Sequence, residues 1–368
     1  MRPARNAALI APFLIAACAF SACAAAQKHP KKTPSRQAAA QPPQAGPAYA
    51  SRPDAMAFAD DLAERRGLSR EWVRQAIGQA RLLPGVPRLM LPPPRGTAKN
   101  WRAYRARFIE PVRIRAGMRF WQNNRDALAR AEREYGVPAE IIVGILGVET
   151  LYGEQTGTYR VMDTLATLAF DFPAAHPRAA ERQAYFRGEL EQFLSHCDRT
   201  GVEPFTPRGS YAGAMGMPQF MPSSWVQYAV DFDGDSRIDL WNSPADAIGS
   251  VASYFKGYGW QPGMPVWYPV RFADDGARVD MQTLLAPDIL PTFGVQRFMA
   301  LGALLDGDAD SHAGPLALVE LQNGGDAPTY VAGTENFYAI TRYNWSSYYA
   351  MAVSELGRAV AAARLVAP

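Results

Sequence analysis

The feature of this 368-residue sequence with the clearest capacity for chemistry is one carboxyl group at the end of a very apolar segment. Glu149 is the last but one residue of Ala139–Thr150, which predicts a helix. In a helix its face also carries three apolar side chains, those of Leu146, Ile145 and Ile142. A carboxyl group against such a face loses hydration, which raises its pKa and suits a general acid. The alternative is that the face turns outward and leaves a solvated charge.

Two glycine-containing segments follow this helix and are candidates for a binding groove. Leu151–Gly157 comes at once, and its glycines allow a ligand or the backbone to approach closely. Gly209–Ser223 combines small residues with an amide, a hydroxyl, methionines and an aromatic ring. This composition suits the lining of a groove for an uncharged ligand rich in hydroxyl groups. A glycine-rich loop packed between helices is the alternative.

An acidic loop starting at Asp231 has the spacing of a calcium site. Asp231, Asp233, Asp235 and Asp239 occupy its first, third, fifth and ninth positions, and Arg237 can offer a carbonyl oxygen at the seventh. Hard oxygen ligands in this alternation suit Ca²⁺. The loop lacks the glycine at position six and the glutamate at position twelve of an EF-hand, so a solvated acidic turn remains the alternative.

Composition and missing motifs exclude several classes of protein. Lys+Arg 38 against Asp+Glu 35 gives a net charge of +3, which argues against a nucleic-acid binder. The three cysteines (Cys18, Cys23 and Cys197) have no metal-ligand spacing, and the four histidines form no HExxH pair. GxSxG, GxxxxGK and GxGxxG motifs are absent, which demotes serine-hydrolase, P-loop and dinucleotide chemistry. Cys197 is expected to be a buried small hydrophobic residue.

The first 26 residues have the pattern of a secretory signal peptide. Arg2 and Arg5 precede the apolar run Ala7–Phe20, which is too short to span a membrane comfortably. Cys18 and Cys23 each follow small residues, as the lipidated cysteine of a bacterial lipoprotein does, and Cys18 fits slightly better. Ordinary cleavage after residues 24–26 is the alternative. Acylation would hold the protein to a membrane without spanning it.

The remaining chain predicts a tether followed by a mainly α, α+β protein. Residues 27–50 are rich in Pro, Gln and Ala and read as a disordered tether, and residues 51–366 read as the folded region. A β-rich insertion is expected at about 262–330, before the final helix. Helices are predicted at 54–66, 69–82, 101–109, 117–135, 139–150, 179–200, 223–230, 246–258 and 346–366, with strands at 266–272 and 316–322.

Three segments in fixed order resemble the membrane-bound lytic murein transglycosylase B family. They are the Gly-Val-Glu-Thr sequence at Gly147–Thr150, the Gly-Ala-Met-Gly-x-x-Gln-Phe-Met-Pro-Ser sequence at Gly213–Ser223, and Asn336–Asn344. The resemblance extends from about Phe58 to Ala363. It implies a lysozyme-like helical core with an additional helical domain and a small β-containing subdomain.

The resemblance also implies a reaction. The expected enzyme cleaves the β-1,4 bond between N-acetylmuramic acid and N-acetylglucosamine in peptidoglycan and forms a 1,6-anhydromuramoyl product. Glu149 matches the single acid/base, which protonates the departing oxygen and then accepts the proton of the muramoyl C6 hydroxyl. The N-acetyl group of the same sugar is expected to assist, so that a second catalytic carboxylate is not needed.

Further residues match the family's site positions. Ser210 and Gln219 match groove residues, and Arg182 matches a basic position that could meet a carboxylate of the substrate, although the long loop before it leaves Arg178 as an alternative. Asp246 matches the residue that closes the acidic loop at 231–246 around a structural Ca²⁺. The other matching positions are Tyr104, Tyr185, Tyr254, Tyr343, Asn344 and Tyr349.

These expectations define a periplasmic, monomeric enzyme of a Gram-negative bacterium, tethered to the outer membrane as a lipoprotein. Its partner is the peptidoglycan glycan strand, it needs no organic cofactor, and nucleic acid is not a partner. Two alternatives remain: a true lysozyme that uses water, and a non-catalytic lipoprotein that binds the cell wall. The presence of Glu149, Ser210 and Gln219 together argues against the second alternative.

Overall fold

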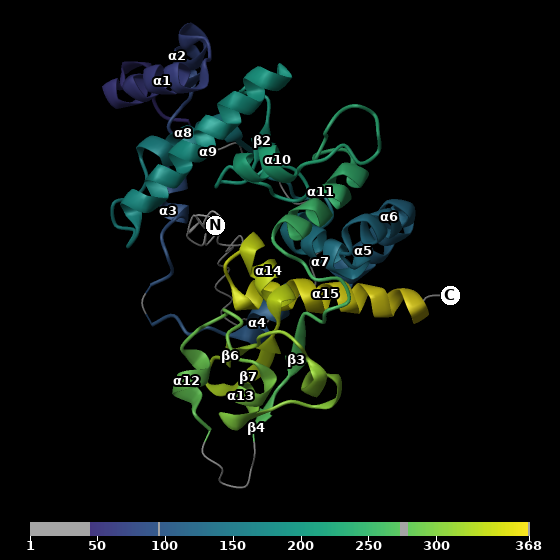
Figure 1. The fold of residues 1–368 in the computed structure, drawn as a ribbon. Helices are drawn as coiled ribbons and strands as arrows, with labels where there is room; N and C mark the ends of the chain where they lie inside the picture. Colours follow the sequence, from purple (N-terminus) through teal and green to yellow (C-terminus); the bar gives the residue numbers. More distant parts are fainter. Residues whose placement is uncertain (1–44, 95, 273–278, 367–368) are drawn as a thin grey trace, which may run out of the picture.

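The computed structural model describes residues 45–94, 96–272 and 279–366, which form an α-lobe, a helical core and a β-subdomain (Figure 1). This architecture confirms the predicted mainly α, α+β class. The expected signal peptide, both candidate lipidation sites and most of the expected tether lie outside the described residues. Within the described ranges, no helix combines the length and apolar character needed to cross a membrane.

The α-lobe, at the upper left of Figure 1, is built on two pairs of helices that are consecutive in the chain. Ser69 caps its second helix as predicted, because its hydroxyl oxygen accepts a hydrogen bond from the backbone nitrogen of Trp72 at 3.3 Å. Cys197 is buried, also as predicted, and burial raises the pKa of its thiol to about 12. The elements of the lobe are η1 (Tyr49–Ser51), α1 (Pro53–Arg66), α2 (Arg70–Gln79), α3 (Val86–Leu89), α8 (Val161–Phe170) and α9 (Ala179–Thr200). The two pairs are α1 with α2 and α8 with α9.

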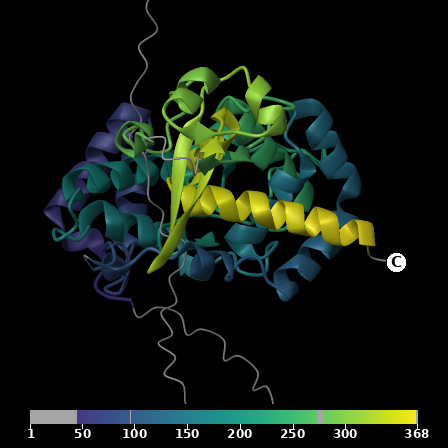
Figure 2. The same ribbon diagram turned by 90° about the horizontal axis from the view of Figure 1, so that it is seen from below.

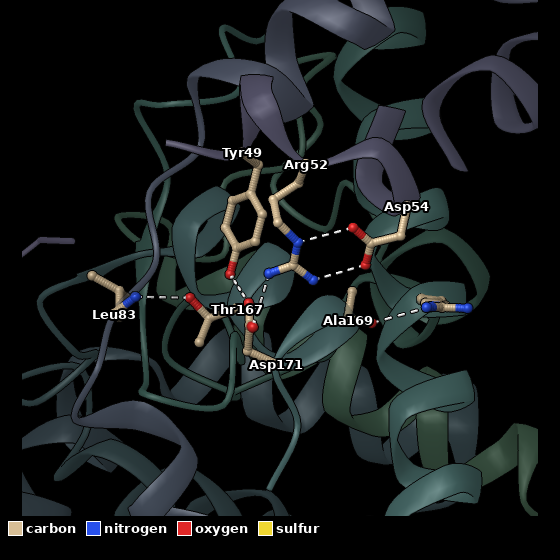
Figure 3. Close-up of polar contacts among 8 residues, drawn as sticks. Tyr49, Arg52, Asp54, Leu83, Thr167, Ala169 and Asp171 are labelled. Carbon is tan, nitrogen blue, oxygen red and sulfur yellow. Dashed lines mark hydrogen bonds and ion pairs between the residues drawn. The ribbon is translucent and has the colours of Figure 1, made fainter. Parts of the chain in front are cut away.

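Polar contacts fix the start of the folded region to the end of α8 (Figure 3). The Tyr49 hydroxyl donates to Asp171 Oδ2 at 2.5 Å, and Arg52 Nη1 donates to Asp171 Oδ1 at 3.0 Å. Arg52 also forms two hydrogen bonds with the Asp54 carboxylate. Tyr49 is only 2% exposed, so the folded region begins a few residues before the expected boundary near residue 50. The hydrogen bond from the buried Tyr49 to the Asp171 carboxylate fixes a segment whose Pro- and Ala-rich composition predicted a linker.

The helical core surrounds α7, and two of its predicted helices need correction. The helix predicted at 117–135 is two helices that meet at Asn124, whose φ of −120° and ψ of 23° are not helical and whose side chain donates to the Phe120 carbonyl oxygen. The helix predicted at 101–109 ends at Arg105. The core elements are α4 (Trp101–Arg105), α5 (Pro111–Asn123), α6 (Arg125–Tyr135), α7 (Ala139–Thr150), β1 (Tyr159–Arg160), β2 (Arg208–Gly209), α10 (Pro222–Tyr228), α11 (Pro244–Gly257), α14 (Glu335–Tyr343) and α15 (Ser347–Val366).

The closest helix packing of the core joins α7 to α15. A Cβ atom added to Gly357 of α15 would lie 2.1 Å from the Glu140 carbonyl oxygen, and one added to Gly144 of α7 would lie 2.2 Å from the Val353 carbonyl oxygen. Glycine at both positions therefore allows the two backbones to touch. Figure 2 shows α15 beginning beside the β-subdomain and running to the opposite edge of the molecule.

The β-subdomain lies at the bottom of Figure 1 and has a small apolar core of its own. Its three-stranded antiparallel sheet has the order β3-β7-β6, and β4 pairs separately with β5. The strand predicted at 266–272 is divided at Val270, since its two halves belong to different sheets. The elements are β3 (Trp267–Pro269), β4 (Arg271–Phe272), α12 (Met281–Leu285), α13 (Val295–Ala300), β5 (Ala303–Leu304), η2 (Gly307–Ser311), β6 (Ala317–Asn323) and β7 (Asp326–Gly333).

The contact between α7 and α15 predicts opposite effects for two helical glycines. Gly357→Ala should lower the free energy of unfolding by about 1–3 kcal/mol, because the added methyl group overpacks a backbone contact. Gly188→Ala, in α9, should raise it by about 0.5–1 kcal/mol, because nothing lies within 4 Å of the new methyl group and alanine is the better helix former. Urea unfolding of the two variants measures both effects. Equal stability of both variants would contradict the close approach of α7 and α15.

Candidate functional site

Helix α7 carries Glu149 to the edge of the core. Its residues are buried apart from Glu140 near its start and Glu149 near its end, which are partly exposed. After the helix, Leu151, Tyr152 and Gly153 have φ of 52°, 59° and 94°, so the chain turns away sharply. Left-handed conformations are costly for non-glycine residues and persist only where the surrounding structure imposes them. The turn leaves the Glu149 carboxyl group at the end of an apolar helix instead of inside it.

Burial and one hydrogen bond set the acidity of Glu149. The Tyr349 hydroxyl, on α15, donates to Glu149 Oε1 at 2.5 Å. Loss of hydration raises the pKa of Glu149 to about 7, and the hydrogen bond from Tyr349 opposes this rise by stabilising the carboxylate. Near neutral pH the group can therefore both give and accept a proton. The solvated helix-end charge considered from the sequence does not describe this carboxyl group.

Several predicted tyrosines surround the acid. The rings of Tyr349 and Tyr343 stack with centroids 6.4 Å apart, and Tyr254 packs against Tyr343 at 4.7 Å. Burial and then the negative charge of Glu149 raise the pKa of Tyr104, Tyr343 and Tyr349, so all three lie within electrostatic reach of the acid. The structure thus brings four tyrosines from four helices to one side of the core.

Two of these tyrosines use their hydroxyl groups to hold backbone. The Tyr343 hydroxyl donates to the Pro218 carbonyl oxygen at 2.5 Å, and the Tyr254 hydroxyl donates to the Arg342 carbonyl oxygen at 2.7 Å. Because both hydroxyls have protein acceptors and Tyr254 is buried, the part of this pair that can meet a ligand is the partly exposed ring of Tyr343.

The glycine-rich loop lies directly beside the end of α7. The Thr150 hydroxyl donates to the Met217 carbonyl oxygen at 2.8 Å, and Gln219 Nε2 donates to the Thr156 carbonyl oxygen at 3.1 Å. Gln219 has a φ of 52°, a left-handed backbone conformation that is strained for any residue other than glycine. Thr150 and Gln219 therefore join the two segments that the sequence places about sixty residues apart. The amide oxygen of Gln219 can accept a hydrogen bond from a ligand.

The other predicted groove residues have mixed surroundings. The Ser210 hydroxyl oxygen accepts from the backbone nitrogens of Ala212 and Ala214 at 3.2 and 3.1 Å, so it stabilises its own turn. Asn344 is buried at the end of α14, between Tyr343 and α15. Tyr185 lies on α9 and is partly exposed.

Arg182 and Arg178 differ in burial and in partners. Arg182, on α9, is 5% exposed and its guanidinium lies over the rings of Tyr185 and Phe186 at 5.6 and 5.4 Å. Burial lowers its pKa. Arg178 is exposed and forms a salt bridge with Glu181. Arg182 therefore adjoins the predicted tyrosine wall through Tyr185, while Arg178 is held by a neighbouring carboxylate.

The acidic loop gathers three of the predicted ligands. Carboxylate oxygens of Asp231, Asp233 and Asp246 lie within 4.8 Å of one another, which fits coordination of one cation by oxygen ligands. Asp246 also accepts backbone hydrogen bonds from Phe232 and Asp239, so it organises the loop. Asp235 is not a member of this group.

The remaining two predicted ligands bond to each other. Asp235 Oδ1 accepts from the backbone nitrogen of Arg237 at 2.8 Å. Asp235 is thus engaged within its own turn, which differs from the prediction that it joins the other three carboxylates.

Sequence reasoning missed two side chains that bond to the predicted site. Thr150 was not singled out, although it follows Glu149 directly, and its buried hydroxyl connects α7 to the glycine-rich loop. Glu189, on α9, is 2% exposed and accepts hydrogen bonds from Ser223, the last residue of the glycine-rich motif. Because Ser223 belongs to that motif, the sequence could have indicated that a partner of Ser223 such as Glu189 matters to the site.

A desolvated carboxyl group at the end of an apolar helix, bordered by aromatic rings and a glycine-rich loop on a helical core, defines a lysozyme-like class of enzyme that acts on glycosidic bonds. The chain belongs to the lytic transglycosylase family: the family model described as "Transglycosylase SLT domain" matches residues 50–358. Membrane-bound lytic murein transglycosylase B of Escherichia coli (strain K12) is 42% identical over 330 residues, which cover 88% of this chain and 86% of that protein.

Solved structures of relatives share the fold. The Escherichia coli lytic transglycosylase Slt35 in complex with bulgecin A matches with a TM-score of 0.76 and 42% identity, over 88% of this chain and 97% of that one. A structure of Slt35 in complex with calcium matches with a TM-score of 0.75 at the same identity and coverage. SltB3 from Pseudomonas aeruginosa, in complex with NAG-anhNAM-pentapeptide, matches with a TM-score of 0.66 and 28% identity, over 82% of this chain and 78% of that one.

The hydrogen bond from Tyr349 predicts a shift in the pH profile. Tyr349→Phe removes a donor that stabilises the Glu149 carboxylate, so the pKa of Glu149 should rise further above its ordinary value. Because a general acid must be protonated, the fall of kcat/KM on the alkaline side should move to higher pH. Rates of glycan cleavage measured across the pH range test this shift. Tyr343→Phe is the matched control, since its hydroxyl donates to Pro218 and its loss should leave the alkaline limb in place.

Proposed function

We propose that Glu149 is the single acid/base of a peptidoglycan lytic transglycosylase reaction. Its protonated carboxyl group gives a proton to the glycosidic oxygen as the bond from that oxygen to the muramoyl C1 breaks. The resulting carboxylate takes the proton of the muramoyl C6 hydroxyl as O6 bonds to C1, with assistance from the N-acetyl group of the same sugar. No water is added, and the product is a 1,6-anhydromuramoyl end.

The observation that carries this proposal is the pKa of Glu149, which burial raises to about 7. A group that must first donate and then accept a proton works best when its pKa is close to the operating pH. A solvated glutamate would be ionised at neutral pH and could not act as the acid. Glu149 is partly exposed at the end of α7, which leaves a glycan access to this residue.

The tyrosine wall and the glycine-rich loop are proposed to hold the glycan strand. The partly exposed rings of Tyr104 and Tyr343 offer apolar surface to sugar rings, with the buried Tyr254 and Tyr349 packed behind them. Gln219 offers an amide oxygen to a sugar hydroxyl. Ser210, Tyr185 and Asn344 complete this wall, and Arg182 supplies a positive charge toward a substrate carboxylate. The complex of SltB3 with a glycan bearing a pentapeptide supports a substrate of this kind.

Replacement of the acid tests the mechanism directly. Glu149→Gln keeps the shape of the side chain but cannot transfer a proton, so the rate should fall by about 10²–10⁴-fold or more. Mass spectrometry of purified peptidoglycan after digestion measures the release of anhydromuropeptides. Glu140→Gln is the matched control, because Glu140 lies on the same helix and burial also raises its pKa. Near-normal release by Glu149→Gln would eliminate this mechanism, and reducing-end products from the unmutated protein would indicate a hydrolytic lysozyme instead.

The same substitution should stabilise the fold at alkaline pH. The folded state keeps the Glu149 proton up to about pH 7, while the unfolded chain releases it near the ordinary pKa of glutamate. Between these values the folded state binds more protons, so its stability falls as pH rises through about 7. Glu149→Gln removes this loss, and its melting temperature should exceed that of the unmutated protein at pH 8 but not at pH 4. A lower melting temperature of the variant at pH 8 would show that burial of the ionised Glu149 carboxylate does not destabilise the fold.

The acidic loop is proposed to bind a structural Ca²⁺. Asp231, Asp233 and Asp246 would supply carboxylate oxygens, with Asp235 and the Arg237 carbonyl oxygen joining through a rearrangement of their turn. The structure of Slt35 in complex with calcium supports this assignment. The ion would neutralise a cluster of like charges and so stabilise the connection between α10 and α11.

Calcium should therefore raise the melting temperature. An ion that binds only the folded state at 100 times its Kd adds about 2.7 kcal/mol to the free energy of unfolding. Asp231→Ala together with Asp233→Ala should abolish the difference in melting temperature between excess Ca²⁺ and chelator. Asp310→Ala, an exposed acidic residue of the β-subdomain, should preserve it. The proposal fails if Ca²⁺ leaves the melting temperature of the unmutated protein unchanged.

We also propose a periplasmic location with a lipid anchor at Cys18 or Cys23. The relative from Escherichia coli is named membrane-bound, and both cysteines follow small residues after an apolar run. Cys18→Ala or Cys23→Ala should move the protein from the membrane fraction to the soluble fraction of cells. A mature chain that starts at Gln27 without an acyl mass would support secretion instead.

A further inference from the structure

A second buried carboxyl group, that of Glu189, lies outside the proposed proton transfers. Glu189 Oε1 accepts from the Ser223 hydroxyl at 2.7 Å, and Glu189 Oε2 accepts from the Ser223 backbone nitrogen at 2.9 Å. The Tyr185 hydroxyl is a third donor. Burial raises the pKa of Glu189, and the groups that oppose this rise are these hydrogen-bond donors. Its environment is therefore built by donors that converge on both carboxylate oxygens.

Glu189 replaces the missing cap of a neighbouring helix. Helix α10 begins at Pro222, and the residue at its N-cap position, Met221, makes no side-chain cap hydrogen bond. The first backbone N–H groups of a helix have no partner within the helix and need an external acceptor. Glu189, 34 residues earlier in the chain, supplies this acceptor to Ser223 from α9. The carboxylate also lies at the positive end of the α10 dipole, where a negative charge is favoured.

The contacts of Glu189 lead to two parts of the proposed glycan wall. Through Ser223 it fixes the end of the segment that carries Gln219 and Phe220, and the Phe220 ring packs against Tyr254 at 5.7 Å. Glu189 also accepts a hydrogen bond from the Tyr185 hydroxyl and so fixes the Tyr185 side chain. Tyr185 in turn lies within electrostatic reach of Tyr254.

The acid is held by a different set of contacts. Glu149 is fixed by α7 and by Tyr349 of α15, and neither of these elements bonds to Glu189 in the part of the chain that the structure describes. A substitution at Glu189 therefore leaves the hydrogen bond from Tyr349 to Glu149 in place.

We propose that Glu189 is a positioning residue that sets the glycan-binding wall by holding Tyr185 and the start of α10 in register. It acts on substrate binding and leaves the proton transfers to Glu149. The inference rests on the proposed function of the site, since the wall matters only if a glycan binds there.

Glu189→Gln tests this role with little change in volume. The amide keeps one oxygen for the Ser223 backbone N–H, but its NH2 group can only donate, so the Ser223 hydroxyl must reverse and accept. Both hydrogen bonds also lose the negative charge that strengthens them. Kinetics with a soluble peptidoglycan oligosaccharide should show KM raised about tenfold, as expected for a charged hydrogen bond, with kcat changed by less than about twofold. The alkaline limb of the pH profile, which reports Glu149, should stay in place.

Controls separate positioning from general stability. Glu191→Gln lies two residues further along α9 and breaks salt bridges to Arg65 and Arg66 of α1. It should lower the melting temperature without changing KM. Ser223→Ala removes one of the same hydrogen bonds with a milder change and should raise KM in the same direction, so it tests the proposal even if Glu189→Gln does not fold. Because both residues act on one contact, the double variant should raise KM no more than Glu189→Gln alone.

The outcomes are distinguishable from those of the proposed function. If the unmutated protein releases no anhydromuropeptides, the proposed function itself fails. If it is active and both Glu189→Gln and Ser223→Ala keep the KM of the unmutated protein, or lower only kcat, the positioning role is overturned. A KM that rises as much in Glu191→Gln as in Glu189→Gln would assign the effect to stability and also overturn it.

Discussion

Desolvation of the Glu149 carboxyl group is the constraint on which the rest of the site depends. An apolar helix can end in a carboxyl group only if the chain turns away at that point, which the left-handed residues from Leu151 to Gly153 achieve. The burial that raises the pKa of Glu149 comes from the packing of α7 inside the core, and glycines at the contact with α15 bring that neighbouring helix close. The acid and the tightest packing of the molecule are therefore parts of one arrangement.

The glycine-rich loop beside the acid is held by hydrogen bonds between side chains and backbone carbonyl oxygens. Three consecutive residues of the glycine-rich loop are each bonded to another element: Met217 to Thr150, Pro218 to Tyr343, and Gln219 to Thr156. Such a loop cannot relax independently of α7 and α14. This rigidity gives a physical reason for strain at Gln219, since a left-handed residue that the surroundings enforce can present its side chain in one orientation.

The sequence predicted helices correctly where proline or glycine residues mark their ends. Helices at Ala139–Thr150 and Ala179–Thr200 have the predicted ends, because proline precedes the first and a left-handed glycine, Gly201, follows the second. Helix α8 was missed because all ten of its residues are buried, so it lacks the alternation of apolar and polar residues that marks a surface helix. The join at Asn124 was missed because helical periodicity continues on both sides of it.

The sequence by itself determined which residue could be the acid, where its helix ends, and that an acidic loop has the spacing of a metal site. These features depend on neighbours within a few turns of one helix or one loop. Tertiary structure alone decided that Tyr349, 200 residues further along, donates to Glu149, that Asp235 lies outside the group of carboxylates, and that Glu189 caps α10. Each of these contacts requires two elements to pack at one distance and rotation, and that geometry follows from the whole core rather than from any local pattern.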